Sequence, residues 1–264
     1  TTENNILRGI ALQAQTSGRS LLHYALNQGN QYVEYLKKHD NIQNISIAGS
    51  LRRRKETIGD IDILVSSSKP DEIMDAFSKY HLVDEVMLKG KTKTSVRLKD
   101  GIQVDLRVVE KKSFGSALQY FTGSKEHNVI VRGLALKKDM KLNEYGVFSK
   151  KTNKYLAGET EKEVYETIGI PFIPPELREN RGEIKAAQQD NLPNLITLND
   201  IKGDLHVHST WSDGINSIEE VVKAAEKLGY DYIGITDHSQ SLKVANGVTI
   251  KNVEKKCKQI KKIN

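Results

Sequence analysis

The stretch AGSLRRRKETIGDIDILV, residues 48 to 65, decides the fold class of this chain. It places three arginines and a lysine, Arg52 to Lys55, a few residues before Asp60 and Asp62, and it ends in apolar residues. A solvated charge run does not normally turn into a strand that carries its own acids. Residues i and i+2 of a strand point to the same side, so the two carboxylates lie together while the isoleucines between them face a core. The stretch therefore predicts a strand that carries a site for an anion and for cations.

A third acid stands in a similar setting, because Asp105 is flanked by apolar residues in IQVDLRVVE. Carboxylate oxygens suit Mg²⁺, which also shares its ligand shell with phosphates. Three carboxylates on neighbouring strands predict a seat for two metal ions, an arrangement used in phosphoryl transfer. Upstream, Gly49 and Ser50 predict a tight turn that approaches a phosphate closely, and Arg53 supplies charged donors. The alternative is an acidic pair that keeps an edge strand soluble, with Ser50 as a helix cap.

The order of residue patterns predicts an α/β (α+β) chain of several parts. Residues 5–38 have the apolar spacing of two helices, and short β-branched runs around a helix at PDEIMDAFSKYH follow from residue 44. Helical spacing returns after residue 113, and the prolines of IPFIPPELRENRGEIKAAQQDNLPN predict a connector. The last part alternates strand and helix, with helices near 217–228 and 250–262.

Composition narrows the function classes. The net charge of +6 favours nucleic acid as a partner, although lysine-rich surfaces are common. The single cysteine, Cys257, excludes an internal disulfide and fits a reducing, cytoplasmic compartment. No apolar run has the length of a membrane helix, so no membrane partner is expected. Because the chain starts with Thr1 rather than Met, we expect a fragment.

The combination of GSLRR, GDID and VDLR, followed by QYFTGSKEHNVIVR, resembles family X DNA polymerases, the DNA polymerase beta group of the nucleotidyltransferase superfamily. The resemblance covers roughly residues 1–180. It implies fingers-like helices at 1–43, a nucleotidyltransferase palm at 44–110, a thumb at 111–180 and a linker at 181–202. The implied function is that of a monomeric, DNA-directed DNA polymerase that adds dNTPs to the primer of gapped DNA in repair.

The resemblance also implies roles for single residues. Asp60, Asp62 and Asp105 would be catalytic and would hold two Mg²⁺ or Mn²⁺ ions, with Asp105 closest to the primer 3′-hydroxyl. The nucleotide-binding residues would be Gly49, Ser50, Arg53, Gly59, Tyr120, Phe121, Gly123 and Asn128. Arg132 would face the template, and helix geometry places it on one face with Asn128.

This chain departs from the family pattern at two positions. Arg54 stands where the beta enzyme has a glycine, and Gln103 stands where it has a basic residue two positions before the third aspartate. Neither change removes a metal ligand. Gln103 removes one candidate for a cation that assists Asp105.

A second constellation lies in GDLHVHSTWSDG and GITDHS. His206, His208, Asp213 and His238 are residue types that bind zinc or manganese, although paired histidines also occur by chance in surface strands. The two motifs resemble the start of the polymerase and histidinol phosphatase (PHP) domain. That resemblance implies a metal-dependent phosphoesterase, a 3′-5′ exonuclease, in a longer protein. Residues 203–264 form only about two βα units, so we expect an incomplete site and no hydrolysis by this chain alone.

Two other functions remain open at this point. One is a template-independent nucleotidyltransferase that acts on RNA or a small molecule, and the motif YFTGS argues against it. The other is a nuclease or phosphatase with a degenerate polymerase half, and the intact Asp60, Asp62 and Asp105 argue against it.

Overall fold

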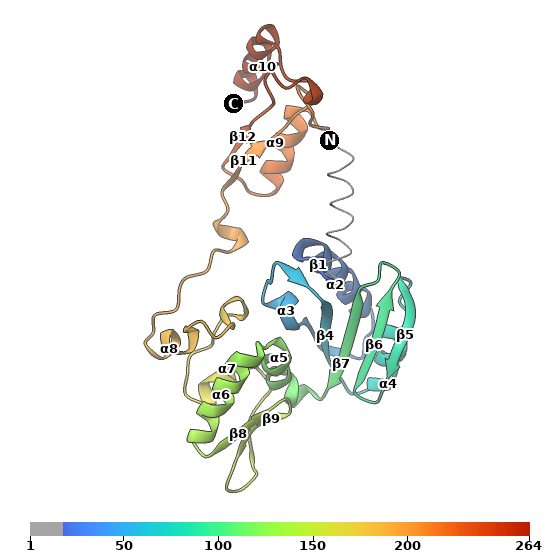
Figure 1. The fold of residues 1–264 in the computed structure, drawn as a ribbon, viewed down its shortest axis with the longest axis vertical. Coiled ribbons are helices and arrows are strands. Elements are labelled where there is room, and N and C mark those ends of the chain that lie inside the picture. The colour runs from blue at the N-terminus through green and yellow to red at the C-terminus, as the bar shows by residue number, and fades with distance from the viewer. Residues whose placement is uncertain (1–17) are drawn as a thin grey trace. The chain divides into compact units, whose positions relative to one another are not determined.

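The computed structural model describes residues 18–264, which fold as two compact units divided between residues 192 and 193. The helix expected within residues 5–15 lies outside the described residues. Each unit has its own sheet arrangement (Figure 1).

The first half of unit 1 is built on a five-stranded sheet with the order β2-β4-β7-β6-β5. The two central strands, β4 and β7, are parallel, and every other pair is antiparallel. The strands are β2 (Ile42–Ile47), β4 (Asp60–Ser67), β5 (Val83–Lys89), β6 (Lys93–Leu98) and β7 (Gln103–Val109). A two-stranded ribbon pairs β1 (Ser20–Leu21) with β3 (Thr57–Ile58).

Alternation of side chains along β4 determines which face of the sheet is covered. Ile61, Ile63 and Val65 are fully buried against α2 (Leu22–Leu36) and α4 (Pro70–Ser78) in one apolar core. The helix α4 begins as its sequence predicts, with proline in the first turn and acidic residues near the positive end of its dipole. The opposite face of β4 therefore stays available for Asp60 and Asp62.

The second half of unit 1 packs helices on a small antiparallel sheet. The helices α5 (Phe114–Thr122) and α6 (Lys125–Lys137) are separated by Gly123 and Ser124. The sheet, of order β10-β9-β8, was not expected from the sequence. Its strands and the remaining helices are β8 (Met140–Asn143), β9 (Gly146–Ser149), β10 (Tyr155–Ala157), α7 (Glu161–Thr167) and α8 (Glu183–Gln188).

The predicted proline-rich connector is wrong for much of its length. Ile173 and Ile184 are buried in the same core as Tyr165 of α7, and Arg178 between them is fully buried. The segment of residues 171–192 belongs to unit 1, so the predicted linker at 181–202 begins inside packed structure. Prolines interrupt helices, but they do not prevent the isoleucines between them from packing.

Unit 2 contains two parallel strands and two long helices. The strands are β11 (Gly203–Val207) and β12 (Tyr232–Ile235), and the helices are α9 (Ile218–Lys227) and α10 (Ile250–Ile263). Ser217 and Glu220 form a capping box that fixes the start of α9. This arrangement confirms the predicted alternation of strand and helix. Many apolar side chains of unit 2, such as Leu205 and Ile215, are exposed to solvent.

No helix in residues 18–264 is both long and apolar enough to cross a bilayer.

Candidate active site

The structure brings the three predicted aspartates to one face of the five-stranded sheet. Asp62 of β4 is the direct neighbour of Asp105 in β7, and Asp60 is the neighbour of Gln103 in the same register. Asp60 is exposed, Asp62 is partly buried and Asp105 is buried. The arrangement follows from the parallel pairing, because opposite residues of parallel strands point to the same side.

Asp62 lies close to two other carboxylates, those of Asp60 and Asp105, and is repelled by both when ionised. Burial, and next the carboxylates of Asp60 and Asp105, raise the pKa of Asp62 to about 7. Like charges this close require cations between them. The donor set therefore fits divalent metal ions, because a bound cation would relieve the repulsion that raises this pKa.

Asp105 is held by donors from two strands. The ammonium Nζ of Lys93 lies 2.5 Å from Asp105 Oδ2, and Gln103 Nε2 donates to Oδ1 at 2.9 Å. Burial alone would raise the pKa of Asp105, but hydrogen bonds from Lys93, Gln103 and Ser95 outweigh it and lower that pKa. The cation that Gln103 does not supply thus comes from the neighbouring strand β6.

Gly49 is required by the position of Asp62. It begins the short helix α3 (Gly49–Arg52) at a φ of +61°, and a Cβ atom there would lie 2.1 Å from Asp62 Oδ2. Only glycine allows the backbone to approach the carboxylate so closely. Ser50 follows in α3 and is partly buried, so the predicted tight turn is the first turn of a helix.

The three arginines after Leu51 have different environments. Arg52 and Arg53 are partly buried and form ion pairs with glutamates of the second half of unit 1. Arg54 has a φ of +58°, a conformation that glycine adopts freely. This backbone conformation explains why a glycine is suited to the position. Gly59, farther along, lies close to the Arg19 guanidinium.

The residues predicted to face the nucleotide lie around the junction of α5 and α6. Asn128 Nδ2 donates to the carbonyl of Tyr120 at 2.7 Å, and Gln119 Nε2 donates to Asn128 Oδ1 at 2.7 Å. Gly123 has a φ of +70° and lies beside Arg53 Nη1. Arg132 is exposed on α6, one helical turn after Asn128.

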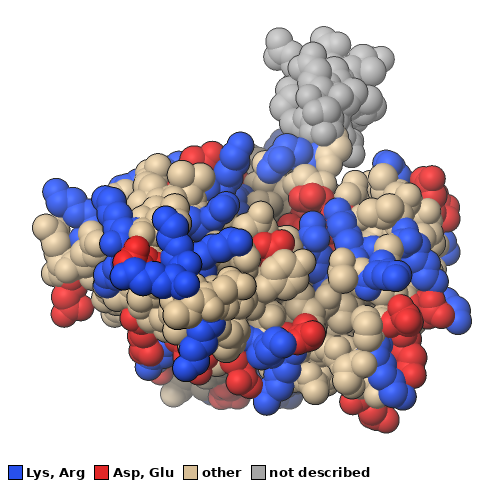
Figure 2. Space-filling view, turned by 90° about the horizontal axis from the view of Figure 1, so that it is seen from below, with Lys and Arg blue, Asp and Glu red and all other residues tan. Residues whose placement is uncertain are grey.

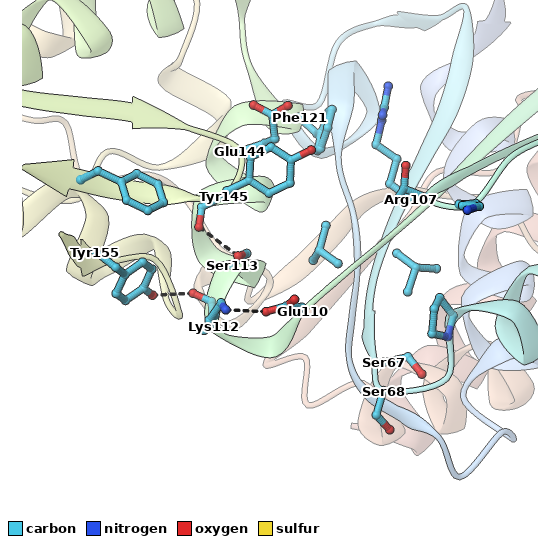
Figure 3. A pocket seen from close by; sticks show the side chains of 16 residues that line it. Ser67, Ser68, Arg107, Glu110, Lys112, Ser113, Phe121, Glu144, Tyr145 and Tyr155 are labelled. Atoms are coloured by element: carbon cyan, nitrogen blue, oxygen red, sulfur yellow. Dashed lines mark hydrogen bonds and ion pairs between the residues drawn. The ribbon is translucent and has the colours of Figure 1, made fainter. Parts of the chain in front are cut away.

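A cavity of about 790 Å³ lies near the far ends of β4 and β7 and contains none of the three aspartates. Figure 3 shows Arg107 of β7 on one side and Phe121, Glu144 and Tyr145 on the other. The Arg107 guanidinium lies 4.2 Å from the centre of the Phe121 ring. Phe121 therefore lines this cavity, and it packs near Leu64 and Arg107 on the same face of the sheet as Asp62 and Asp105.

Several side chains around the site were not found from the sequence. Glu161 and Glu179 pair with arginines that are more than 100 positions away in the chain, and Lys93 pairs with Asp105 across a strand boundary. No local pattern marks the two glutamates. Lys93 is opposite Arg107 in the register of β6 and β7, whereas Ser95 is opposite Asp105, so the contact of Lys93 with Asp105 is diagonal between the two strands.

Unit 2 brings three of the four predicted metal ligands within 4.8 Å of one another: His208, Asp213 and His238. His208 Nδ1 lies 2.8 Å from Asp213 Oδ1, and this hydrogen bond is the main reason that the pKa of Asp213 is lowered. The fourth residue, His206, has its Nε2 3.1 Å from Nε2 of His208. The parallel pairing of β11 with β12 is thus what gathers these side chains.

Both carboxylate oxygens of Asp237, the residue before His238, have hydrogen-bond or ion-pair partners within unit 2. It accepts hydrogen bonds from Ser209 and Ser212, and Lys256 of α10 lies 2.6 Å from its Oδ2. This carboxylate ties α10 to the loop that carries Asp213.

The raised pKa of Asp62 makes the stability of the fold depend on pH. Since its folded-state pKa lies above the unfolded value, the ionised carboxylate destabilises the fold, and the penalty grows as pH rises from about 4 to 7. In metal-free buffer at pH 8, we expect Asp62→Asn to stabilise the protein by on the order of 2 kcal/mol, or about 5 °C in Tm. The gain should vanish near pH 4.

Thermal unfolding followed by circular dichroism in EDTA tests this expectation. Asp84→Asn removes the same charge at an exposed position of β5 and serves as the control. If Asp62→Asn raised the Tm equally at pH 8 and at pH 4, repulsion between the carboxylates would not be the cause of the gain.

Two family models match the chain. The DNA polymerase beta thumb matches residues 117–179, and the PHP domain matches residues 204–264. The chain is 39% identical, over its whole length, to the DNA polymerase/3′-5′ exonuclease PolX of Bacillus subtilis, and it spans 46% of that relative. It is 29% identical to the repair DNA polymerase X of African swine fever virus, over 61% of this chain and 91% of that protein.

A solved structure supports the fold. Polymerase beta of Leishmania infantum, from a ternary P/T complex, matches 62% of this chain and 77% of its own with a TM-score of 0.53 and 23% sequence identity. The predicted fold class is confirmed by this similarity. The match to the polymerase beta thumb, the match to the PHP domain that follows it and the full-length similarity to the bacterial relative confirm the predicted resemblance to the family X DNA polymerases.

Proposed function

We propose that unit 1 is the nucleotidyltransferase part of a DNA-directed DNA polymerase that fills gaps during repair, acting as a monomer in the cytoplasm. The observation that carries the proposal is the set of three carboxylates on paired strands, with Gly49 packed against Asp62. The substrates would be a dNTP and the primer 3′-hydroxyl of gapped DNA.

Asp60, Asp62 and Asp105 would hold two Mg²⁺ or Mn²⁺ ions. Bound there, such ions would neutralise phosphate charge and favour attack by the primer hydroxyl. The chain's own residues orient the reactants. Lys93 and Gln103 keep Asp105 ionised and fixed, and the Arg53 guanidinium would bind the β and γ phosphates together with Ser50 and Gly59.

The junction of α5 and α6 would contact the sugar and base of the nucleotide. Tyr120, Phe121 and Gly123 would lie against the sugar and discourage a 2′-hydroxyl. The bond from Asn128 to the Tyr120 carbonyl couples the end of α5 to α6, so Asn128 and Arg132 would meet the nascent pair and the template as one body. The domain ranges expected from the sequence are proposed on the same basis, with the linker shortened to follow residue 192.

The surface supports a nucleic acid partner. Figure 2 shows many Lys and Arg side chains across the viewed face, with fewer acidic side chains interspersed among them. Together with a net charge of +6, this distribution favours binding to a phosphate backbone.

For unit 2 we propose a contribution to a metal-dependent phosphoesterase, a 3′-5′ exonuclease, in which His206, His208, Asp213 and His238 bind Zn²⁺ or Mn²⁺. The gathered imidazoles and carboxylate are suitable ligands for such ions.

Primer extension on a one-nucleotide gap tests the proposed polymerase. With Mg²⁺ or Mn²⁺, we expect incorporation of the dNTP that pairs with the template and much slower use of the matching rNTP. Extension that ignores the template base would favour a template-independent transferase. Shortening of the primer without extension would favour a nuclease.

A further inference from the structure

Two adjacent arginines of the phosphate-facing segment are held by two different glutamates from the end of unit 1. Arg52 makes a bidentate pair with Glu161, at 2.8 and 2.6 Å, and its Nη1 also donates to Thr122 Oγ1 at 2.7 Å. Both terminal nitrogens of Arg52 are therefore engaged within the protein. Arg52 serves the packing of α3 against α5 and α7.

Arg53 is held differently, at two nitrogens of its guanidinium that donate to different partners. Its Nε donates to Glu179 Oε1 at 2.8 Å, and its Nη1 donates to the carbonyl of Thr122. In residues 18–264, no hydrogen bond occupies Nη2 of Arg53. The side chain is only 13% exposed, so Nη2 is presented by a largely immobilised group.

Glu179 is itself fixed by its neighbour in the chain. Arg178 is fully buried, its Nη1 lies 2.7 Å from Glu161 Oε1, and its Nε donates to the Ile173 carbonyl at 2.9 Å. The backbone carbonyl of Arg178 accepts a hydrogen bond from the amide of Ser124 at 2.9 Å. The backbone next to Glu179 is thus tied to the junction of α5 and α6, where the nucleotide is proposed to bind.

We propose that Glu179 is a positioning residue for nucleotide binding, which orients the Arg53 guanidinium so that its Nη2 meets the triphosphate. The inference rests on the proposed function of unit 1. Immobilising a long side chain before the ligand arrives removes an entropic cost from binding. The acceptor at Nε and the carbonyl at Nη1 together fix the plane of the guanidinium, which a single contact would not do.

A purely structural role for this ion pair is the competing explanation, in which it only attaches residues 171–180 to the sheet. Binding measurements separate the two roles, because a structural tie affects stability whereas a positioning contact affects nucleotide affinity through Arg53. Glu179→Gln keeps an oxygen acceptor for Nε without the negative charge. Glu176→Ala removes an exposed glutamate from the same segment and is the matched control.

The experiment measures the Kd of Mg·dATP on a gapped primer-template that lacks a 3′-hydroxyl, and kcat and KM on the reactive substrate. We expect Glu179→Ala to raise both Kd and KM about five- to tenfold, with kcat within about twofold of wild type. Glu179→Gln should bind at least as tightly as wild type, as should Glu176→Ala. The double variant Arg53→Ala/Glu179→Ala should bind as Arg53→Ala alone does.

The outcomes separate this inference from the proposed function. Wild-type protein that binds no Mg·dATP, or normal binding by Arg53→Ala, would overturn the proposed nucleotide site and this inference with it. Weak binding by Arg53→Ala beside normal binding by Glu179→Ala would overturn only the role of Glu179. The role of Glu179 would also be overturned if the losses of nucleotide affinity added up in the double variant. The same holds if Glu179→Gln lost as much affinity as Glu179→Ala.

Discussion

Asp105→Ala is expected to reduce primer extension to background while Mg·dNTP binding stays close to that of wild type. Asp60 and Asp62 lie together on β4 and would still hold the metal ion that accompanies the nucleotide. Asp105 comes from the other strand, and in the proposed site it is the carboxylate closest to the primer 3′-hydroxyl. Loss of this group leaves Lys93 without its carboxylate partner, which adds a positive charge beside the phosphates rather than removing one.

Single-turnover extension on gapped DNA, with the Kd of Mg·dNTP measured separately, checks this expectation. Asp84→Ala is the control, since it removes an exposed carboxylate from β5 of the same sheet. Asp105→Asn keeps the size of the side chain and should be equally inactive, because the amide lacks the charge. Near wild-type extension by Asp105→Ala would remove this aspartate from the proposed metal site.

The parts of the fold that depend on short-range patterns were predictable from the sequence. Alternation in DIDILV separates Asp60 and Asp62 from the isoleucines that fill the core, and the strand around Asp105 has the same pattern. Parallel pairing of β4 with β7 then suffices to bring the acids together. In unit 2, the spacing of His206 and His208 and the alternation of strand with helix predicted the cluster with Asp213 and His238 in the same way.

Contacts between distant segments were not predictable, because they leave no periodic signal. The bidentate pair of Arg52 with Glu161 joins residues 109 positions apart, and Glu179 lies 126 positions from Arg53. The prolines of the segment that carries Glu179 predict a connector, but Ile173 and Ile184 are buried there. Tertiary packing determined the structure of this segment, and the same packing places both glutamates.

Gly49→Ala is expected to reduce polymerase activity by about a hundredfold, the effect expected when a catalytic group moves by about an ångström. The added Cβ would lie 2.1 Å from Asp62 Oδ2, so the carboxylate or the start of α3 must move. Either movement separates Asp62 from Asp105 or shifts the segment that carries Arg53. Affinity for Mg²⁺, measured by titration of the protein with the metal alone, should fall with the activity.

Backbone strain and displacement of Asp62 must be separated, because Gly49 has a φ of +61° and any substitution there is strained. Gly101 offers the matched control, since its φ is +90° and a Cβ at that position would meet no atom within 4 Å. Both variants should lose about 1 kcal/mol of stability from the left-handed backbone. Only Gly49→Ala should lose activity and metal affinity, and equal losses in the two variants would show that strain, rather than contact with the carboxylate, makes glycine necessary beside Asp62.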